Sequence, residues 1–334
     1  MAIHGTGSPL LMSEIQTEFG GSNPISMSEY YAGGANVPSG TSGNGGDIPS
    51  SGAINFNIFY TAAKSTRVAI ALQISQAATS SYNIFSNKGG SYSAGQSDVT
   101  LTVQADVTSG ATGQAAIETG SFASGDTVKI INNAQIRGRG GAGGGGAQAT
   151  GQNTTQIAGQ AGGAAGHAIN LQFPVTIQNN GGHIRGAGGG GGGGGNASNA
   201  DSKGNINLSA GGGGGGGGAA LGAGGAAGTT NGTVQRASAA GQTADDAQAD
   251  YGNGGQGASG GATGSPATAG QGGQGGDYAS SGVTGGSGAS RNSSGTTFTG
   301  GAGGAGGAAG KAINLNSNQL TWEDGNTNIQ GAVS

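Results

Sequence analysis

The stretch GGGGGGGGNASNADSKGNINLSAGGGGGGGG, residues 188–218, decides the fold of this chain. Two runs of eight glycines, Gly188–Gly195 and Gly211–Gly218, flank the polar insert Asn196–Ala210. Glycine loses more backbone entropy on folding than any other residue, so a flexible linker is one interpretation of each run. Two runs of equal length around a turn-rich insert favour another interpretation, a pair of extended three-fold helices that lie antiparallel.

A three-fold helix of the polyproline II type has no internal hydrogen bonds, so its backbone N–H and C=O groups point sideways. Those groups need partners when they are buried. Glycine helices carry no side chains, and neighbours can therefore bond each other through backbone groups and Cα–H···O contacts. We predict a packed polyglycine II lattice with loops such as Asn196–Ala210 at the ends of its helices.

The composition separates this region from the rest of the 334-residue chain. Most of the 82 glycines fall between Gly138 and Gly310, and only 8% of residues are charged, so no single apolar core spans the chain. The net charge of −4 and the lack of any Lys/Arg run argue against nucleic acid as a partner. The absence of cysteine excludes disulfides and thiolate metal sites. The N-terminal residues do not form a secretory signal, and no stretch has the length and hydropathy of a membrane span.

Three copies of a strand–turn–strand unit occur in this part of the chain, and glycine tracts connect them. They are VKIINNAQIRG (128–138), VTIQNNGGHIRG (175–186) and LTWEDGNTNIQG (320–331), and the last two follow the related segments GGAAGHAINL (162–171) and GGAAGKAINL (306–315). Repeats that cannot bury an apolar face alone stack on their copies. Stacking places Ile130, Ile177 and Trp322 in one column, and the asparagine pairs 132/133 and 179/180 in another.

Period-two alternation before the repeats predicts further strands, the clearest at 67–74 and 99–107 with shorter ones at 82–85 and 115–118. We expect an all-β chain with a small β-sandwich-like domain, a polyglycine II lattice and stacked strand units. The expected domains are an N-terminal attachment segment (1–63), a β domain (64–131), a glycine-rich polyglycine II domain with surface loops (132–310) and a closing strand unit (311–334).

The first 63 residues contain an internal echo, in which PISMSEYY (24–31) is answered by AINFNIFY (53–60). Two short strands or helical turns joined by a loop are one interpretation. The other is a docking module, whose aromatic ends need a partner surface because such small units make no stable core alone. The attachment candidates are therefore Tyr30, Tyr31, Phe59 and Tyr60.

The segment GSNPISMSEYY (21–31), followed by a spacer and IPSSGAINF (48–56), resembles the start of tail fibre and tail-tip proteins of tailed bacteriophages. Strand units combined with glycine tracts over 131–334 resemble the polyglycine II domain of phage tail-fibre adhesins. The resemblance implies a virion protein of the phage tail, made in the host cytoplasm. Its partners would be other phage tail proteins and a host cell-surface receptor, protein or glycan, and a homo-oligomer is compatible with it.

A purely structural tail component that braces other subunits is the alternative function. A glycine-helix ice-binding protein is disfavoured because long polar loops interrupt a flat face. A Gly/Ala-rich surface protein shares the Gly-Gly-Ala tracts at 300–310 but not this N-terminus.

Few residues suit catalysis, and we expect no enzyme, no cofactor and no metal site. Lys311 replaces His167 in the matching copy, which indicates a structural role for that position. The acidic residues Asp245, Asp246 and Asp250 crowd one loop and are expected to be solvated. Arg137 and Arg185 occupy equivalent positions and are expected to stack on peptide groups or to cap carbonyls where a glycine tract begins.

Three aromatic residues, Tyr251, Tyr278 and Phe298, lie at loop or tract ends with no apolar periodicity around them. Tyrosine gives a large contact area at low entropic cost, which suits recognition. We expect these residues to contact the receptor; packing within the loops is the alternative.

Overall fold

The computed structural model describes residues 3–38, 40–64, 67–150, 156–200, 206–210, 212–231, 235–236, 268–292, 297–324 and 326–334. The chain forms two compact units, one of Met1–Ile70, Lys88–Val99 and Phe122–Thr127, and one of Ala71–Asn87, Thr100–Ser121 and Val128–Ser334. The helices of the described part are α1 (Met12–Phe19) and the 3₁₀ helices η1 (Met27–Tyr30), η2 (Phe56–Phe59) and η3 (Phe85–Asn87). None of the described helices has the length and hydropathy to cross a membrane.

The N-terminal module, residues 3–64, has its own apolar core. Ile15 and Phe19 of α1 pack with Tyr30 of η1 and Phe59 of η2, and all four are fully buried. The Phe59 ring meets those of Phe19 and Tyr30 edge-on, with centroid distances of 6.1 and 6.3 Å, a geometry that aromatic pairs favour. The echo segments are therefore helical turns. The expectation that they need a partner surface is wrong, because α1 covers their aromatic ends.

The strands of this module, β1 (Ser42–Gly43) and β2 (Gly46–Asp47), form a short antiparallel hairpin.

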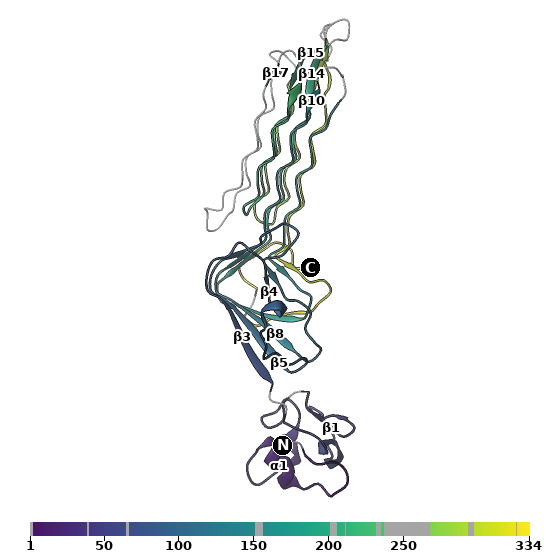
Figure 1. Cartoon of the computed structure of the whole chain (residues 1–334), viewed down its shortest axis with the longest axis vertical. Helices are drawn as coiled ribbons and strands as arrows, with labels where there is room; N and C mark the ends of the chain where they lie inside the picture. Colours follow the sequence, from purple (N-terminus) through teal and green to yellow (C-terminus); the bar gives the residue numbers. More distant parts are fainter. Residues whose placement is uncertain are drawn as a thin grey trace. The chain divides into compact units, whose positions relative to one another are not determined.

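The strands of the repeats form three sheets (Figure 1). The first sheet has the order β21 (Leu320–Trp322), β12 (Val175–Asn179), β8 (Thr127–Asn132), β5 (Ser97–Val103) and β3 (Val68–Ile74). The second has β20 (Ile313–Asn314), β11 (Ile169–Asn170), β7 (Ile117–Glu118) and β4 (Tyr82–Asn83). The third has β22 (Ile329–Gln330), β13 (His183–Arg185), β9 (Gln135–Arg137) and β6 (Val107–Thr108).

Each repeat contributes one strand to each of the three sheets and pairs with its copies in parallel, as β8 does with β12 and β9 with β13. Ile117, Ile130 and Ile136, one from each sheet, are fully buried. The prediction of a sandwich-like domain over residues 64–131 is therefore wrong. Buried and less buried residues alternate along its strands as in a sandwich. These strands nevertheless belong to the same sheets as those of the later repeats, because each strand pairs with its own copy.

The predicted columns are confirmed. Ile177 lies between Ile130 and Trp322 in the first sheet, and Asn179 lies opposite Asn132. The Asn132 amide donates to Asn179 Oδ1 over 2.9 Å and the Asn179 amide to Thr327 O over 2.7 Å. These bonds satisfy polar groups that would otherwise be costly to bury.

Between the repeats the chain runs along extended glycine segments, which lie side by side in Figure 1. Backbone hydrogen bonds join neighbouring segments at every third residue. One example is the series from the N–H groups of 141, 144 and 147 to the carbonyls of 188, 191 and 194, at 2.9, 2.8 and 2.9 Å. The backbone of each segment is thus satisfied by its neighbours and not by itself.

Whether a glycine segment lies inside or outside the set of packed segments explains where alanine occurs in it. Every residue of Gly188–Gly195 is buried, and a Cβ atom added to Gly192 would lie 1.8 Å from Gly304 O. In the outer segment 300–310, Gly301, Gly304 and Gly307 are buried, whereas the alanines at 302, 305 and 308 are exposed. Inner segments therefore require uninterrupted glycine, and outer segments accept a side chain at every third residue.

A five-stranded sheet, named here the distal sheet, lies at the end of the glycine segments away from the three sheets (Figure 1). Its order is β17 (Gln235–Arg236), β15 (Ile206–Ala210), β14 (Ala197–Ala200), β18 (Ala289–Asn292) and β19 (Thr297–Thr299). Beside it, β10 (Ala149–Thr150) pairs with β16 (Thr230–Asn231). The polar inserts are therefore partly paired strands at the point where they leave the glycine segments.

Candidate functional site

The four attachment candidates are mainly part of the core of the N-terminal module. Tyr30 and Phe59 are fully buried, so the prediction that they contact a partner directly is wrong. The half-buried Tyr31 and Tyr60 use their hydroxyl groups internally. Tyr31 donates to Gly52 O, and Tyr60 donates to Ser8 O over 2.9 Å and accepts from the N–H of Leu10 over 3.1 Å.

The exposed apolar residues of this module are different ones. Leu11, immediately before α1, is 59% exposed, and Phe56, the first residue of η2, is 37% exposed. Neither was singled out from the sequence, since the echo pattern draws attention to the aromatic pairs. The signal for Leu11 is its position at the N-cap of α1, where polar residues are normally preferred.

The three receptor candidates lie in different structural environments. Tyr251 lies outside the described residues. Phe298 lies in β19, opposite Ser290 of β18. Tyr278 is only 8% exposed, so the prediction that it contacts a receptor is wrong. Its ring is packed inside the protein, which was the alternative.

Tyr278 belongs to a junction between the glycine segments and the sheets. Its ring packs on Ala219, Ala220 and Leu221, and the guanidinium of Arg185, at the end of β13, lies over it with 5.2 Å between Cζ and the ring centroid. The Arg185 side chain is 1% exposed. A cation over an aromatic face is attractive and gains strength when desolvated. Arg185 was expected to stack on peptide groups or to cap carbonyls; the group over which it stacks is the ring of Tyr278.

Further contacts hold Arg185 in this position. One terminal nitrogen donates to Gln135 Oε1 over 2.9 Å, and the other lies 3.1 Å from His183 Nδ1. The equivalent Arg137 donates to Thr108 Oγ1 over 3.1 Å and lies 3.6 Å from Asp106. Equivalent arginines therefore bond along the third sheet, and Arg185 also lies over the ring of Tyr278.

His167 connects two repeats, as its alignment with Lys311 indicates. The backbone N–H of Lys311 donates to His167 Nδ1 over 2.9 Å. Burial, and then the charge of Lys311, lower the pKa of His167. A neutral imidazole that accepts at Nδ1 carries its proton on Nε2.

The stability of the protein is expected to fall as the pH drops below about 6.5, the pKa of an unperturbed histidine. In that range the unfolded chain takes up a proton at position 167 that the folded chain, with its lowered pKa, resists. His167→Gln should remove this component and leave the carboxylate titrations in place. Chemical denaturation of both proteins between pH 5 and 8 measures this component. If the unfolding free energies of the two proteins changed in parallel with pH, the lowered pKa of His167 would be contradicted.

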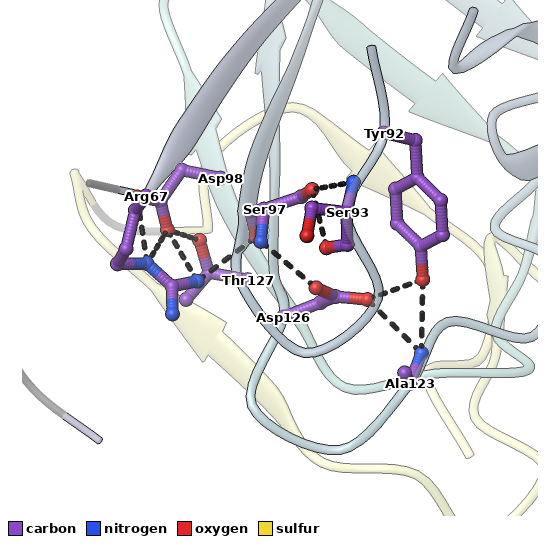
Figure 2. Close-up of polar contacts among 8 residues, drawn as sticks. All are labelled: Arg67, Tyr92, Ser93, Ser97, Asp98, Ala123, Asp126 and Thr127. Carbon is purple, nitrogen blue, oxygen red and sulfur yellow. Dashed lines mark hydrogen bonds and ion pairs between the residues drawn. The ribbon is translucent and has the colours of Figure 1, made fainter. Parts of the chain in front are cut away.

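A polar cluster gathers two carboxylates near the start of β3 and β5 (Figure 2). Arg67 donates to both oxygens of Asp98 at 2.8 and 2.9 Å, and Thr127 also donates to Asp98. The hydrogen bond from Arg67 is the main cause that lowers the pKa of Asp98.

Asp126, the second carboxylate of this cluster, accepts from the Tyr92 hydroxyl over 2.6 Å and from the backbone N–H of Ser97 and Ala123 over 2.9 and 3.0 Å (Figure 2). Burial, followed by this bond to Asp126, raises the pKa of Tyr92. Both carboxylates are thus hydrogen-bonded inside the cluster, which favours a structural role in holding segments 92–98 and 122–127 together over acid–base chemistry.

Within the described part of the chain, no group of three or more His, Cys, Asp or Glu side chains is arranged to hold a metal ion. Asp245, Asp246 and Asp250 lie outside the described residues.

No curated protein matches the chain. Among solved structures, the gp37–gp38 adhesin tip complex of the bacteriophage S16 long tail fibre is similar, with 22% identity, full coverage of both chains and a TM-score of 0.42. The family described as phage tail fibre adhesin Gp38 matches residues 67–334, which hold all three sheets and the glycine segments. The chain therefore belongs to the Gp38 family of phage tail fibre adhesins.

Proposed function

We propose that this adhesin binds its receptor, a protein or a glycan, through the loops at the distal sheet, on a polyglycine II scaffold. As a family member it is a virion tail protein that serves host attachment. The observation that carries the proposal is that the glycine segments use their backbone groups on each other. Side chains that discriminate between receptors are therefore concentrated at the segment ends. Its role is binding, and we propose no catalysis.

The polyglycine II assignment is supported by the three-residue period of the hydrogen bonds and by the alternation of buried glycine and exposed alanine. A β-sheet has a period of two, whereas a three-fold helix returns the same face after three residues. In this organisation residues 132–310 form the polyglycine II domain with surface loops. The strands of 64–131 and 311–334 support it, and residues 1–63 attach the adhesin to other tail proteins after synthesis in the host cytoplasm.

Tyr251 and Phe298 are the proposed receptor contacts. Aromatic anchors at interfaces commonly contribute about 2 kcal/mol or more each, so Tyr251→Ala/Phe298→Ala is expected to weaken binding to host cells at least tenfold. Binding of labelled protein to host cells measures this, with thermal unfolding as the check on folding. Undiminished binding by the folded double variant would place the receptor contact elsewhere and favour a bracing role.

Attachment to the tail is proposed to use the exposed apolar residues Leu11 and Phe56. Exposed apolar side chains of this size gain free energy when a partner covers them. Leu11→Ser/Phe56→Ser should retain the fold of the module and lose incorporation into virions.

These two double variants control for each other. The Leu11→Ser/Phe56→Ser protein should still bind host cells, and the Tyr251→Ala/Phe298→Ala protein should still enter virions. Quantitative immunoblots of purified particles measure incorporation. Normal incorporation of the Leu11→Ser/Phe56→Ser protein would exclude these two residues as attachment contacts, leaving self-association of the chain as a use for them.

A further inference from the structure

A polar cavity of about 340 Å³ opens on the second sheet, at the end of the glycine segments away from the distal sheet (Figure 1). Its floor comes from β7, β11 and β20, where Asn170 lies opposite both Glu118 and Asn314. Successive residues of a strand point to opposite faces, and the preceding isoleucines, 117, 169 and 313, are buried. Glu118, Asn170 and Asn314 therefore share the outer face. Loop 112–115 forms one wall, and Asn316 contributes to the other.

Most polar groups around the cavity bond to each other. The amides of Asn314 and Asn316 both donate to Asn170 Oδ1, over 2.9 and 2.6 Å. The ammonium of Lys311 donates to Asn314 Oδ1 over 2.9 Å and to Ser334 O over 3.0 Å. These bonds hold the floor rigid, and they direct the side-chain oxygen of Asn170 toward Asn314 and Asn316.

Two donors remain without a protein partner in the described part of the chain. They are the amide nitrogen of Asn170, whose oxygen is fully used, and Nε2 of His167, which carries the proton because Nδ1 accepts from Lys311. Glu118, beside Asn170, accepts from Gln172 and, over 3.4 Å, from the N–H of Ala115. A carboxylate has room for about four hydrogen bonds, so it can accept more.

This set of groups selects for one ligand chemistry. A hydroxyl group accepts from an N–H donor and at the same time donates to a carboxylate, which matches Asn170 or His167 beside Glu118. An apolar ligand is disfavoured, since pockets for such ligands are lined mainly by hydrophobic and aromatic side chains. An anion is disfavoured by Glu118, and the described residues form no metal-binding cluster.

We propose that the cavity on the second sheet binds a single sugar unit of a host-surface polysaccharide, through hydroxyl bonds to Asn170, His167 and Glu118. This site is separate from the loops at the distal sheet and does not depend on the proposed receptor contact. It would hold the adhesin weakly along a glycan while the loops engage the receptor.

The test uses the full chain and saturation-transfer NMR with methyl glycosides of glucose, galactose, N-acetylglucosamine and heptose at millimolar concentration. Wild type should bind at least one of them. Asn170→Asp keeps the acceptor oxygen for Asn314 and Asn316 and removes the free donor, so binding should weaken at least tenfold. Asn133→Asp is the matched control, because it keeps the oxygen that accepts from Asn180 in the turn between β8 and β9, outside the cavity lining, and it should bind like wild type.

A second variant blocks the cavity without touching its floor. A Cβ atom added to Gly113 meets nothing within 4 Å, so Gly113→Trp should preserve the unfolding temperature and abolish sugar binding. Tyr251→Ala/Phe298→Ala should leave sugar binding unchanged, which separates this site from the loops. The proposal is overturned if no glycoside binds wild type, or if Gly113→Trp or Asn170→Asp binds as wild type does.

Discussion

Gly192→Val is expected to unfold the glycine-rich part of the protein. Gly192 donates to Val283 O over 2.9 Å, and its carbonyl accepts from Gly273 over 2.7 Å. The added Cβ would lie 1.8 Å from Gly304 O, which belongs to the backbone of another segment. No rotamer relieves that overlap, so segments must separate and lose hydrogen bonds. We expect a loss of more than about 3 kcal/mol, the upper end of the usual effect of overpacking.

Hydrogen exchange of the amides of 188–195, together with thermal unfolding, measures this effect. Ala305→Val is the matched control: it adds the same β-branched side chain to the segment that Gly192 touches, but at an exposed position. The control should unfold like wild type. If Gly192→Val were as stable as Ala305→Val, the glycine segments would be loosely associated and the interpretation as a flexible linker would be favoured.

Tyr278→Ala is expected to have the next largest effect. Removing a buried aromatic ring typically costs about 3–5 kcal/mol, and here it also uncovers the buried guanidinium of Arg185. Tyr278 lies in the turn between segments 268–276 and 280–288, and the second of these leads into β18 of the distal sheet. We expect faster hydrogen exchange across 268–288, and weaker host binding as a consequence.

Tyr278→Phe separates this anchoring role from a receptor contact. It retains the ring beneath Arg185, so it should retain both stability and host binding. Loss of host binding by a fully stable Tyr278→Phe protein would show instead that the hydroxyl group meets the receptor.

The sequence predicts most of what depends on local chemistry. Matched repeats predicted the register of Ile130, Ile177 and Trp322, because copies that pair in parallel bring equal positions together. The alternation at 99–107 correctly indicated strands, but alternation alone does not distinguish antiparallel pairing in a sandwich from parallel pairing with a distant copy. The strands β4 and β5 were predicted, but their membership, with β6, in a further copy of the repeat was not, because this copy lacks the Asn-Asn turn of the later copies.

The candidate residues were harder to predict. An aromatic residue in a polar, glycine-rich context has no periodicity that reveals its surroundings, and Tyr278 is buried by the turn at 219–221, far from it in sequence. Tyr30 and Phe59 are buried by α1, an eight-residue helix whose apolar residues at 15 and 19 make a single contact stripe. Burial that depends on such distant contacts is not encoded in the residues next to it.

The three-residue period of the glycine segments also limits how they change length. In the proposed polyglycine II helices, one added residue turns all that follow by about 120° about the helix axis. In segment 300–310 this would move the exposed Ala305 toward the carbonyls that now face Gly304. Three added residues restore the original face and lengthen the segment by about 9 Å. Because adjoining segments must end at the same level to bond each other, adhesins of this family are expected to differ in reach by whole turns gained or lost in several segments together.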